Sequence, residues 1–319
     1  MAISVMPSRP ATLPVVSMST TENARFHKST AASVDILSRH AACASMASET
    51  GASGDEKAEL SGIAIAIANV CSYERVCAPG LGAVDFAWKG APVRVLWLHG
   101  SGYTGESFAA QTEAFPDSQA LLLPGHPDGE ALTSVAELAS WLARQVAAQG
   151  GARIIVGGNS LGGAIALQWA MDFPEQAAGL ILIGTGARLR VSDALFSLID
   201  GGWPGSIETL VDNALSPNAS VDLRRRAEAW HRSVGRDATH RDYAACNAWD
   251  VRDRLGEIQI PALILVGELD EMTPPKFSQY LAQHLSDGKL VIVPGAGHIV
   301  QAEKPAEVNA AIAEFLDRF

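Results

Sequence analysis

Residues 154–162 read Ile-Ile-Val-Gly-Gly-Asn-Ser-Leu-Gly, and this stretch decides the fold. The apolar run 154–156 predicts a strand buried on both faces, and the residues after Ser160 predict a helix. Such a sharp turn from strand to helix strains the backbone at the serine, and Gly158 and Gly162 leave room for the close approach. The hydroxyl is then exposed at the start of the helix, where the helix dipole stabilises negative charge. The alternative is a glycine-rich turn with a serine N-cap.

A serine hydroxyl needs a neighbouring base to act as a nucleophile, and His298 is the best candidate. It follows the apolar run 290–293 and Pro294-Gly295-Ala296-Gly297, so we expect it on a loop at the carboxyl end of a strand. His126 follows another strand and could border the site, although a structural role in its loop is favoured. The remaining histidines are assigned to the amino-terminal segment, a turn or the surfaces of helices, and they are His27, His40, His99, His231, His240 and His284.

The acid that orients the base should come from another strand end. The apolar run 263–266 leads into Gly267-Glu268-Leu269-Asp270-Glu271, which offers three carboxylates. We choose Asp270 and expect the other two carboxylates on the surface. A carboxylate hydrogen-bonded to Nδ1 of His298 would set the tautomer of the ring and stabilise the imidazolium that forms during reaction.

Backbone N–H groups able to hold an oxyanion are expected from two turns. The apolar run 93–98 ends in His99-Gly100-Ser101-Gly102-Tyr103, a turn of small residues that supplies one donor. The second donor is the N–H of Leu161, directly after the nucleophile. No His or Cys spacing indicates a metal site, and no cofactor is expected.

Short apolar runs alternate with helical stretches over the rest of the chain. This alternation predicts an α/β fold, with a mostly parallel sheet and helices on both faces. The expected strands are 63–70, 83–88, 93–98, 121–123, 154–156, 180–183, 263–266 and 290–293, and the expected helices are 106–115, 134–148, 161–173, 276–285 and 306–319.

One insertion, residues 187–259, interrupts this alternation without a clear strand of its own. Leu223, Ala227, Trp230 and Val234 have the spacing of one helical face. We interpret the insertion as a mostly helical lid over the carboxyl ends of the strands, where such sheets bind ligands. Its aromatic residues could line an acyl pocket, although core packing is favoured for most of them, and they are Phe196, Trp203, Trp230, Tyr243 and Trp249.

Residues 1–58 differ from the α/β domain predicted over 59–319. They are rich in Ala, Ser and Thr and show no sustained periodicity, so they are predicted to be a disordered tail. Their Ser-rich, Arg-containing and acid-poor composition would also suit an organelle transit peptide. A dispensable tail or a translation start assigned too early is equally consistent. Without a secretory signal or a membrane-spanning run, we expect a cytoplasmic protein or, with a transit peptide, an organellar one.

The net charge disfavours some classes of partner, and the cysteine spacing indicates the redox state of the thiols. The formal net charge is −11, which disfavours binding to nucleic acid or to an anionic membrane. The four cysteines form no C-x-x-C pair, and they are expected to be free thiols, although a Cys71–Cys77 bridge stays open. A small-molecule substrate is therefore expected, bound by a monomer or a homodimer.

Four motifs together resemble the α/β-hydrolase superfamily, in its lidded carboxylesterase-like branch. They are Leu98-His99-Gly100-Ser101-Gly102, Gly158-Asn159-Ser160-Leu161-Gly162-Gly163, Gly267-Glu268-Leu269-Asp270 and Pro294-Gly295-Ala296-Gly297-His298, and the resemblance runs from about residue 75 to 319. It implies a catalytic triad of Ser160, Asp270 and His298. It also implies that Ser101 is the first oxyanion donor, with Gly102 as the alternative.

Hydrolysis of a small carboxylic ester through an acyl-enzyme intermediate is the function that these residues favour. The same triad could open a lactone, cleave a thioester or hydrolyse a C–C bond. A ligand sensor that keeps the triad and signals by lid movement is a further alternative. Epoxide hydrolysis and dehalogenation are disfavoured, because they need a carboxylate where Ser160 stands.

Overall fold

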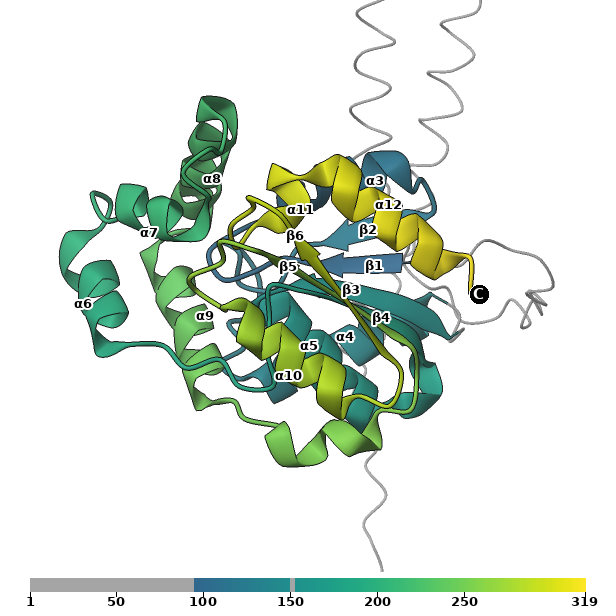
Figure 1. Cartoon of the computed structure of the whole chain (residues 1–319). Helices are drawn as coiled ribbons and strands as arrows, with labels where there is room; N and C mark the ends of the chain where they lie inside the picture. The colour runs from purple at the N-terminus through teal and green to yellow at the C-terminus, as the bar shows by residue number, and fades with distance from the viewer. Residues whose placement is uncertain (1–94, 150–152) are drawn as a thin grey trace, which may run out of the picture. The chain divides into compact units, whose positions relative to one another are not determined.

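The computed structural model describes residues 95–149 and 153–319, and its centre is a six-stranded sheet in the order β2-β1-β3-β4-β5-β6 (Figure 1). Every neighbouring pair of strands is parallel. All carboxyl ends of the strands therefore lie at one edge of the sheet. The strands are β1 (Val95–Leu98), β2 (Ser118–Leu121), β3 (Ile154–Asn159), β4 (Ala177–Ile183), β5 (Ala262–Gly267) and β6 (Gly288–Val293).

The central strands bury both faces, and successive residues pack into different cores. In β4, Leu180 and Leu182 pack on one side and Ile181 and Ile183 on the other. This two-sided burial explains the continuous apolar runs in the sequence. The predicted α/β fold class is thereby confirmed.

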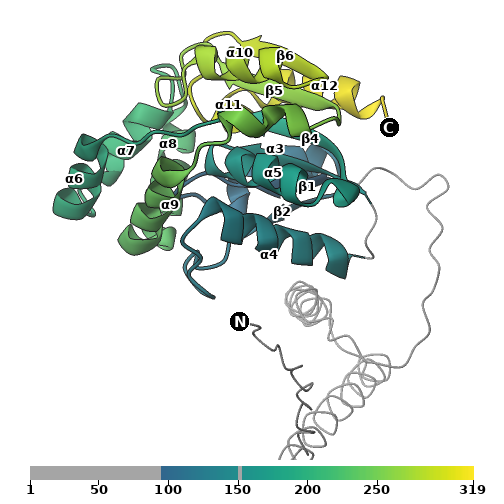
Figure 2. The ribbon, with the colours of Figure 1, turned by 90° about the horizontal axis from the view of Figure 1, so that it is seen from below.

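Helices cover both faces of the sheet. One face carries α4 (Val135–Ala148), α5 (Leu161–Asp172) and α10 (Pro275–His284), and Figure 2 shows α4 and α5 side by side. The opposite face carries the 3₁₀ turn η1 (Gly105–Phe108) and the helices α3 (Ala109–Ala114), α11 (Val300–Glu303) and α12 (Pro305–Leu316). Among the described residues, no helix is both long and apolar enough to cross a bilayer.

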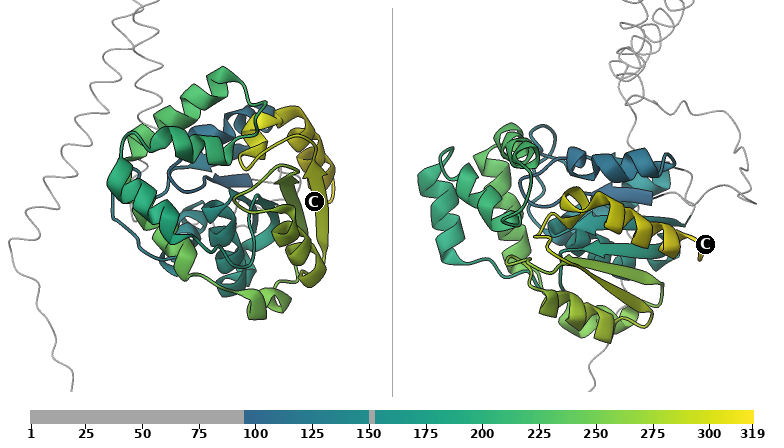
Figure 3. Two further views of the ribbon diagram at one scale, coloured as in Figure 1. Left: turned by 60° about the vertical axis from the view of Figure 1, so that its left-hand side comes forward. Right: turned by 45° about the horizontal axis from the view of Figure 1, so that its top comes forward.

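The insertion between β4 and β5 is helical. It contains α6 (Asp193–Gly202), α7 (Ile207–Ala214), α8 (Val221–Val234), α9 (Arg236–Ala248) and the 3₁₀ segment η3 (Arg252–Glu257). Figure 3 shows α6 to α9 gathered at one end of the sheet. The predicted apolar face of α8 is buried, with Leu223, Ala227, Trp230 and Val234 between 0% and 4% exposed. An isolated antiparallel bridge between Arg188 and Asp250 ties the two ends of the insertion together.

Two predicted elements differ from the structure in more than the extent of their ends. The strand expected over 121–123 is observed as the edge strand β2, which begins earlier and ends at Leu121. Leu123 already belongs to the following loop. The expected helix 106–115 is divided into η1 and α3. The predicted tail 1–58, the boundary at residue 59, the strands 63–70 and 83–88, and Cys43, Cys71 and Cys77 lie outside the described residues.

Candidate active site

Ser160 stands at a sharp turn between β3 and α5, as the sequence predicted. Its backbone has φ 54° and ψ −113°, a strained conformation for a residue with a side chain. A Cβ atom on Gly158 would lie 2.2 Å from the backbone of Gly162, and one on Gly162 would lie 2.1 Å from the carbonyl oxygen of Leu98. Glycine is therefore required at both positions, because any side chain would force β1, β3 and α5 apart.

His298 and Asp270 meet at the same edge of the sheet, after β6 and β5. Nδ1 of His298 lies 2.9 Å from Oδ2 of Asp270. A carboxylate only accepts, so Nδ1 carries the proton and the lone pair of Nε2 is left free. Asp270 and His298 are 3% and 2% exposed, which shields this hydrogen bond from water.

Thr273 also contacts Asp270, and it was not among the site residues predicted from the sequence. Its hydroxyl donates to Oδ2 of Asp270 at 2.8 Å, and its backbone N–H donates to Oδ1 at 2.8 Å. Burial raises the pKa of Asp270, but the charge and hydrogen bond of His298 and the two bonds from Thr273 outweigh burial and bring the pKa below its usual range. The carboxylate is thus ionised at neutral pH. Aspartate and threonine side chains often bond to backbone groups a few residues away, so the Asp-x-x-Thr spacing was a sequence signal for this contact.

The turn that carries Ser160 and the loop that carries His298 are joined through Asn159, the residue before the serine. Its side-chain Nδ2 donates to the backbone oxygen of His298 at 3.1 Å and to that of Ile183 at 3.3 Å. Among the described residues, no hydrogen bond joins the Ser160 hydroxyl to His298. A contact between a nucleophile and its base often tightens only when substrate binds.

The backbone N–H groups at the predicted oxyanion site are not equivalent. The N–H of Gly102 already donates to Oδ2 of Asp242 at 3.0 Å. The N–H groups of Ser101 and Leu161 donate to no other described residue. This difference favours Ser101 and Leu161 as the oxyanion donors over the alternative, Gly102.

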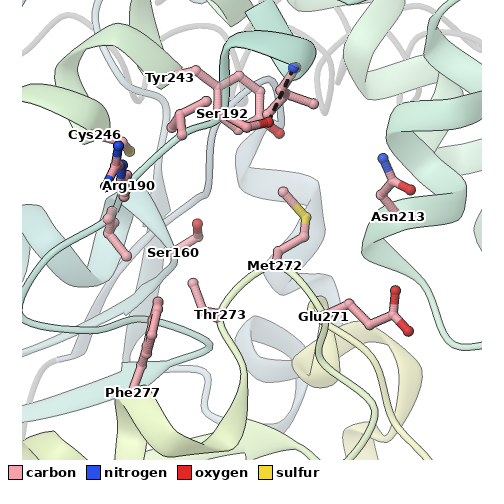
Figure 4. Close-up of a pocket in the computed structure, with 13 residues that line it drawn as sticks. Ser160, Arg190, Ser192, Asn213, Tyr243, Cys246, Glu271, Met272, Thr273 and Phe277 are labelled. Atoms are coloured by element: carbon pink, nitrogen blue, oxygen red, sulfur yellow. Dashed lines mark hydrogen bonds between the residues drawn. The ribbon is translucent and has the colours of Figure 1, made fainter.

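A cavity of about 330 Å³ opens over Ser160 between the sheet edge and the insertion (Figure 4). Of the described residues that line it, Arg190 alone is a cation, and it forms no ion pair with another described residue. Figure 4 shows Arg190 and Glu271 on different sides of Ser160. Of the five aromatic residues considered as acyl-pocket candidates, Tyr243 is the one that lines the cavity. Glu271 and its neighbour Glu268 are exposed, as expected.

The thiol of Cys246 lines the same cavity from α9. Burial raises the pKa of this thiol to about 12, although a hydrogen bond from Ser101 opposes the shift. The thiol is therefore protonated at neutral pH and unreactive as a nucleophile. In the described part of the chain, no three His, Cys, Asp or Glu side chains are grouped so that they could hold a metal ion.

Two histidines outside the predicted triad are buried. His126, whose role the sequence left open, is 1% exposed and lies 2.8 Å from Asp242 through its Nε2. His231 was expected on a helix surface, and that prediction is wrong: it is 0% exposed and packs against Tyr103 and Trp203. The reason is tertiary, because α8 turns this position toward the core rather than toward solvent.

Comparison with known proteins agrees with the fold. The model of the alpha/beta hydrolase family matches residues 76–311. The chain belongs to this family. The predicted resemblance is thus confirmed, and the ordered residues Ser160, Asp270 and His298 fall within the matched region.

Relatives of this α/β hydrolase include enzymes with different substrates. The chain is 27% identical over 175 residues to 2-hydroxy-6-oxo-6-phenylhexa-2,4-dienoate hydrolase of Comamonas testosteroni, a match that covers 50% of this chain and 61% of the relative. It is 28% identical over 222 residues to pimeloyl-[acyl-carrier protein] methyl ester esterase of Neisseria meningitidis, covering 64% and 86%. The chain thus spans less than two thirds of the first of these relatives.

A thermophilic esterase of known structure has the same fold as this α/β hydrolase. It superimposes with a TM-score of 0.64 at 28% identity, and the match covers 70% of this chain and 89% of the esterase. The two sequence relatives and this structure place the chain among hydrolases.

Proposed function

We propose that this α/β hydrolase cleaves a small carboxylic ester through an acyl-enzyme intermediate on Ser160. The observation that carries the proposal is the convergence of three parts at one sheet edge. These parts are the strained serine, the buried hydrogen bond between His298 and Asp270, and the unpaired N–H groups of Ser101 and Leu161. The three parts correspond to the nucleophile, the base with its orienting acid, and the oxyanion donors that acyl transfer uses.

In the proposed reaction, Oγ of Ser160 attacks the ester carbonyl while Nε2 of His298 takes its proton. The N–H groups of Ser101 and Leu161 hold the oxyanion of the tetrahedral intermediate. His298 returns the proton to the leaving alkoxide, and the alcohol departs. A water molecule, deprotonated by the same ring, then hydrolyses the acyl-enzyme to the acid and restores the serine.

The cavity supports a small substrate, and the insertion that forms one wall is proposed to act as a lid. At about 330 Å³ it is near the lower end of the usual range for ligand pockets. The relatives are named for different substrates, since one is a methyl ester esterase and another is a dienoate hydrolase. A lactone, a thioester and a C–C substrate are therefore the alternatives.

A panel of aryl and alkyl esters, thioesters and lactones, assayed with wild type and with Ser160→Ala, tests the proposal. We expect turnover of a short-chain aryl ester by the wild type, and its loss in a folded Ser160→Ala variant. Retained turnover in that variant would refute the assignment. Faster turnover of a lactone or thioester than of any ester would select that alternative. Ligand-dependent binding of a partner protein with negligible turnover would instead favour a sensor.

A further inference from the structure

The turn that carries the proposed oxyanion donor is held by a side chain of the insertion. Oδ2 of Asp242, in α9, accepts the N–H of Gly102 at 3.0 Å, and the carboxylate is 3% exposed. Gly102 has φ +70°, and the N–H of Tyr103 closes the turn on the carbonyl oxygen of Gly100 at 3.2 Å. The bond to Asp242 orients the peptide that directly follows Ser101, so it constrains the direction of the neighbouring Ser101 N–H.

His126 contacts the same oxygen of this carboxylate. Nε2 of His126 lies 2.8 Å from Oδ2 of Asp242, and Nδ1 lies 3.1 Å from the carbonyl oxygen of Leu123 and 3.3 Å from that of Pro124. His126 thus contacts the buried carboxylate of Asp242 through one ring nitrogen and the backbone of its own loop through the other, so it fixes the position of that carboxylate.

His99 links this pair back to the turn. Its ring packs edge-on against that of His126, with ring centroids 4.9 Å apart. Burial, and then the charge of His126, lowers the pKa of His99 to about 3, so the ring is neutral. Its Nε2 accepts the N–H of Leu123 at 3.1 Å, and its Nδ1 donates to the carbonyl oxygen of Gly100 at 3.0 Å. The turn is thus fixed at both peptides that flank Ser101.

The insertion also contacts the other half of the site. The carbonyl oxygen of Ala214, at the end of α7, accepts the backbone N–H of His298 at 2.8 Å. Cys246 of α9 touches the hydroxyl of Ser101, with Sγ and Oγ 3.7 Å apart. The insertion therefore reaches both the base and the oxyanion turn with specific contacts, which a simple cover would not need.

We propose that Asp242 and His126 are positioning residues that align the oxyanion turn, so that the active site is complete only when α9 is docked. This inference rests on the proposed function. A turn rotated away from the developing oxyanion would leave substrate binding almost intact and slow the chemical step, because the donor acts mainly in the transition state.

Steady-state kinetics on the best ester of the panel tests this inference with Asp242→Asn and Asp242→Leu. The amide oxygen of asparagine can still accept the N–H of Gly102, whereas leucine cannot. We therefore expect kcat in the order wild type, Asp242→Asn, Asp242→Leu, with a total loss of about 10- to 100-fold and KM changed by less than about threefold. Asp237→Asn, an exposed position on the same helix, is the matched control and should keep wild-type kcat.

A second measurement separates alignment from general loss of structure. Binding of a trifluoromethyl ketone, which forms an oxyanion with the serine, should weaken in proportion to kcat/KM across the variants. His126→Asn should lower kcat similarly, and the double variant with Asp242→Leu should lose no more than Asp242→Leu alone, because the two residues act as one unit.

Folded Asp242→Leu and Asp242→Asn variants with kcat within twofold of wild type would overturn the inference. A loss confined to KM would do the same. If Asp242→Leu does not fold, Asp242→Asn and His126→Asn carry the test. A failure of the proposed function is recognised separately, in the ester panel. It would appear there as no turnover by the wild type, or as turnover that persists in Ser160→Ala.

Discussion

Asp270→Asn is the substitution whose outcome the structure specifies most closely. Oδ1 of Asp270 accepts the backbone N–H of Thr273, while Oδ2 faces Nδ1 of His298 and the hydroxyl of Thr273. An asparagine has one oxygen and one NH₂ group for these two positions. If the NH₂ group took the Oδ1 position, it would face the Thr273 N–H at about the 2.8 Å of the present bond, two buried donors against each other, at a cost of about 1–3 kcal/mol.

The asparagine should therefore place its oxygen toward the Thr273 N–H and its NH₂ group toward His298. Nδ1 would then have to accept, and the proton of the neutral ring would move to Nε2. That tautomer cannot take a proton from Ser160. We expect kcat for the best ester to fall by about four orders of magnitude, or ~5.5 kcal/mol, with KM little changed.

Steady-state ester hydrolysis at pH 7–8 measures this loss, and thermal unfolding verifies that the variant is folded. Glu268→Gln is the matched control, because Glu268 is exposed and a glutamine can still accept the N–H of Gly295. It should keep wild-type kcat. A folded Asp270→Asn variant with kcat within tenfold of wild type would refute the reasoning about the tautomer, and with it the role of Asp270.

Three further predictions follow from packing, charge and burial. Gly158→Ala should lower the free energy of unfolding by about 3 kcal/mol in chemical denaturation, because its Cβ would meet the backbone of Gly162, whereas Gly201→Ala, with nothing within 4 Å, should not lower it. Arg190 is the cation that lines the cavity among the described residues, so Arg190→Met should raise KM for a carboxylate-bearing ester roughly fivefold (~1 kcal/mol) and leave KM for a neutral ester of the same size unchanged. An equal change of KM for both esters would argue against an anion contact. Burial lowers the pKa of His231 from 6.5 to about 4. As pH falls from 6.5 to 4 the unfolded chain therefore takes up a proton that the folded protein does not, and the free energy of unfolding should fall by up to about 3 kcal/mol. Unfolding curves of His231→Leu should lack this decrease, and a pH profile equal to that of wild type would contradict the prediction.

The fold and the meeting of Asp270 and His298 at the sheet edge near Ser160 could be predicted, because each leaves a local trace in the sequence. Continuous apolar runs follow from strands buried on both faces, and Gly158 and Gly162 follow from a turn in which any Cβ would meet backbone. The loop residues Asp270 and His298 follow their strands closely, and a parallel sheet brings all such loops to one edge. Local rules thus determined the fold class and the residues at the carboxyl ends of the strands.

Only the tertiary structure assigned the residues that reach this edge from elsewhere. Asp242 lies in the middle of a helix that the sequence shows as one more charged stretch, and nothing near it indicates a contact with Gly102, 140 residues away. His126 and His231 have ordinary loop and helix positions, yet docking of the insertion buries both. A buried carboxylate is stable only with its partners in place, and these partners come from segments distant in sequence, so the three-dimensional packing decides its role.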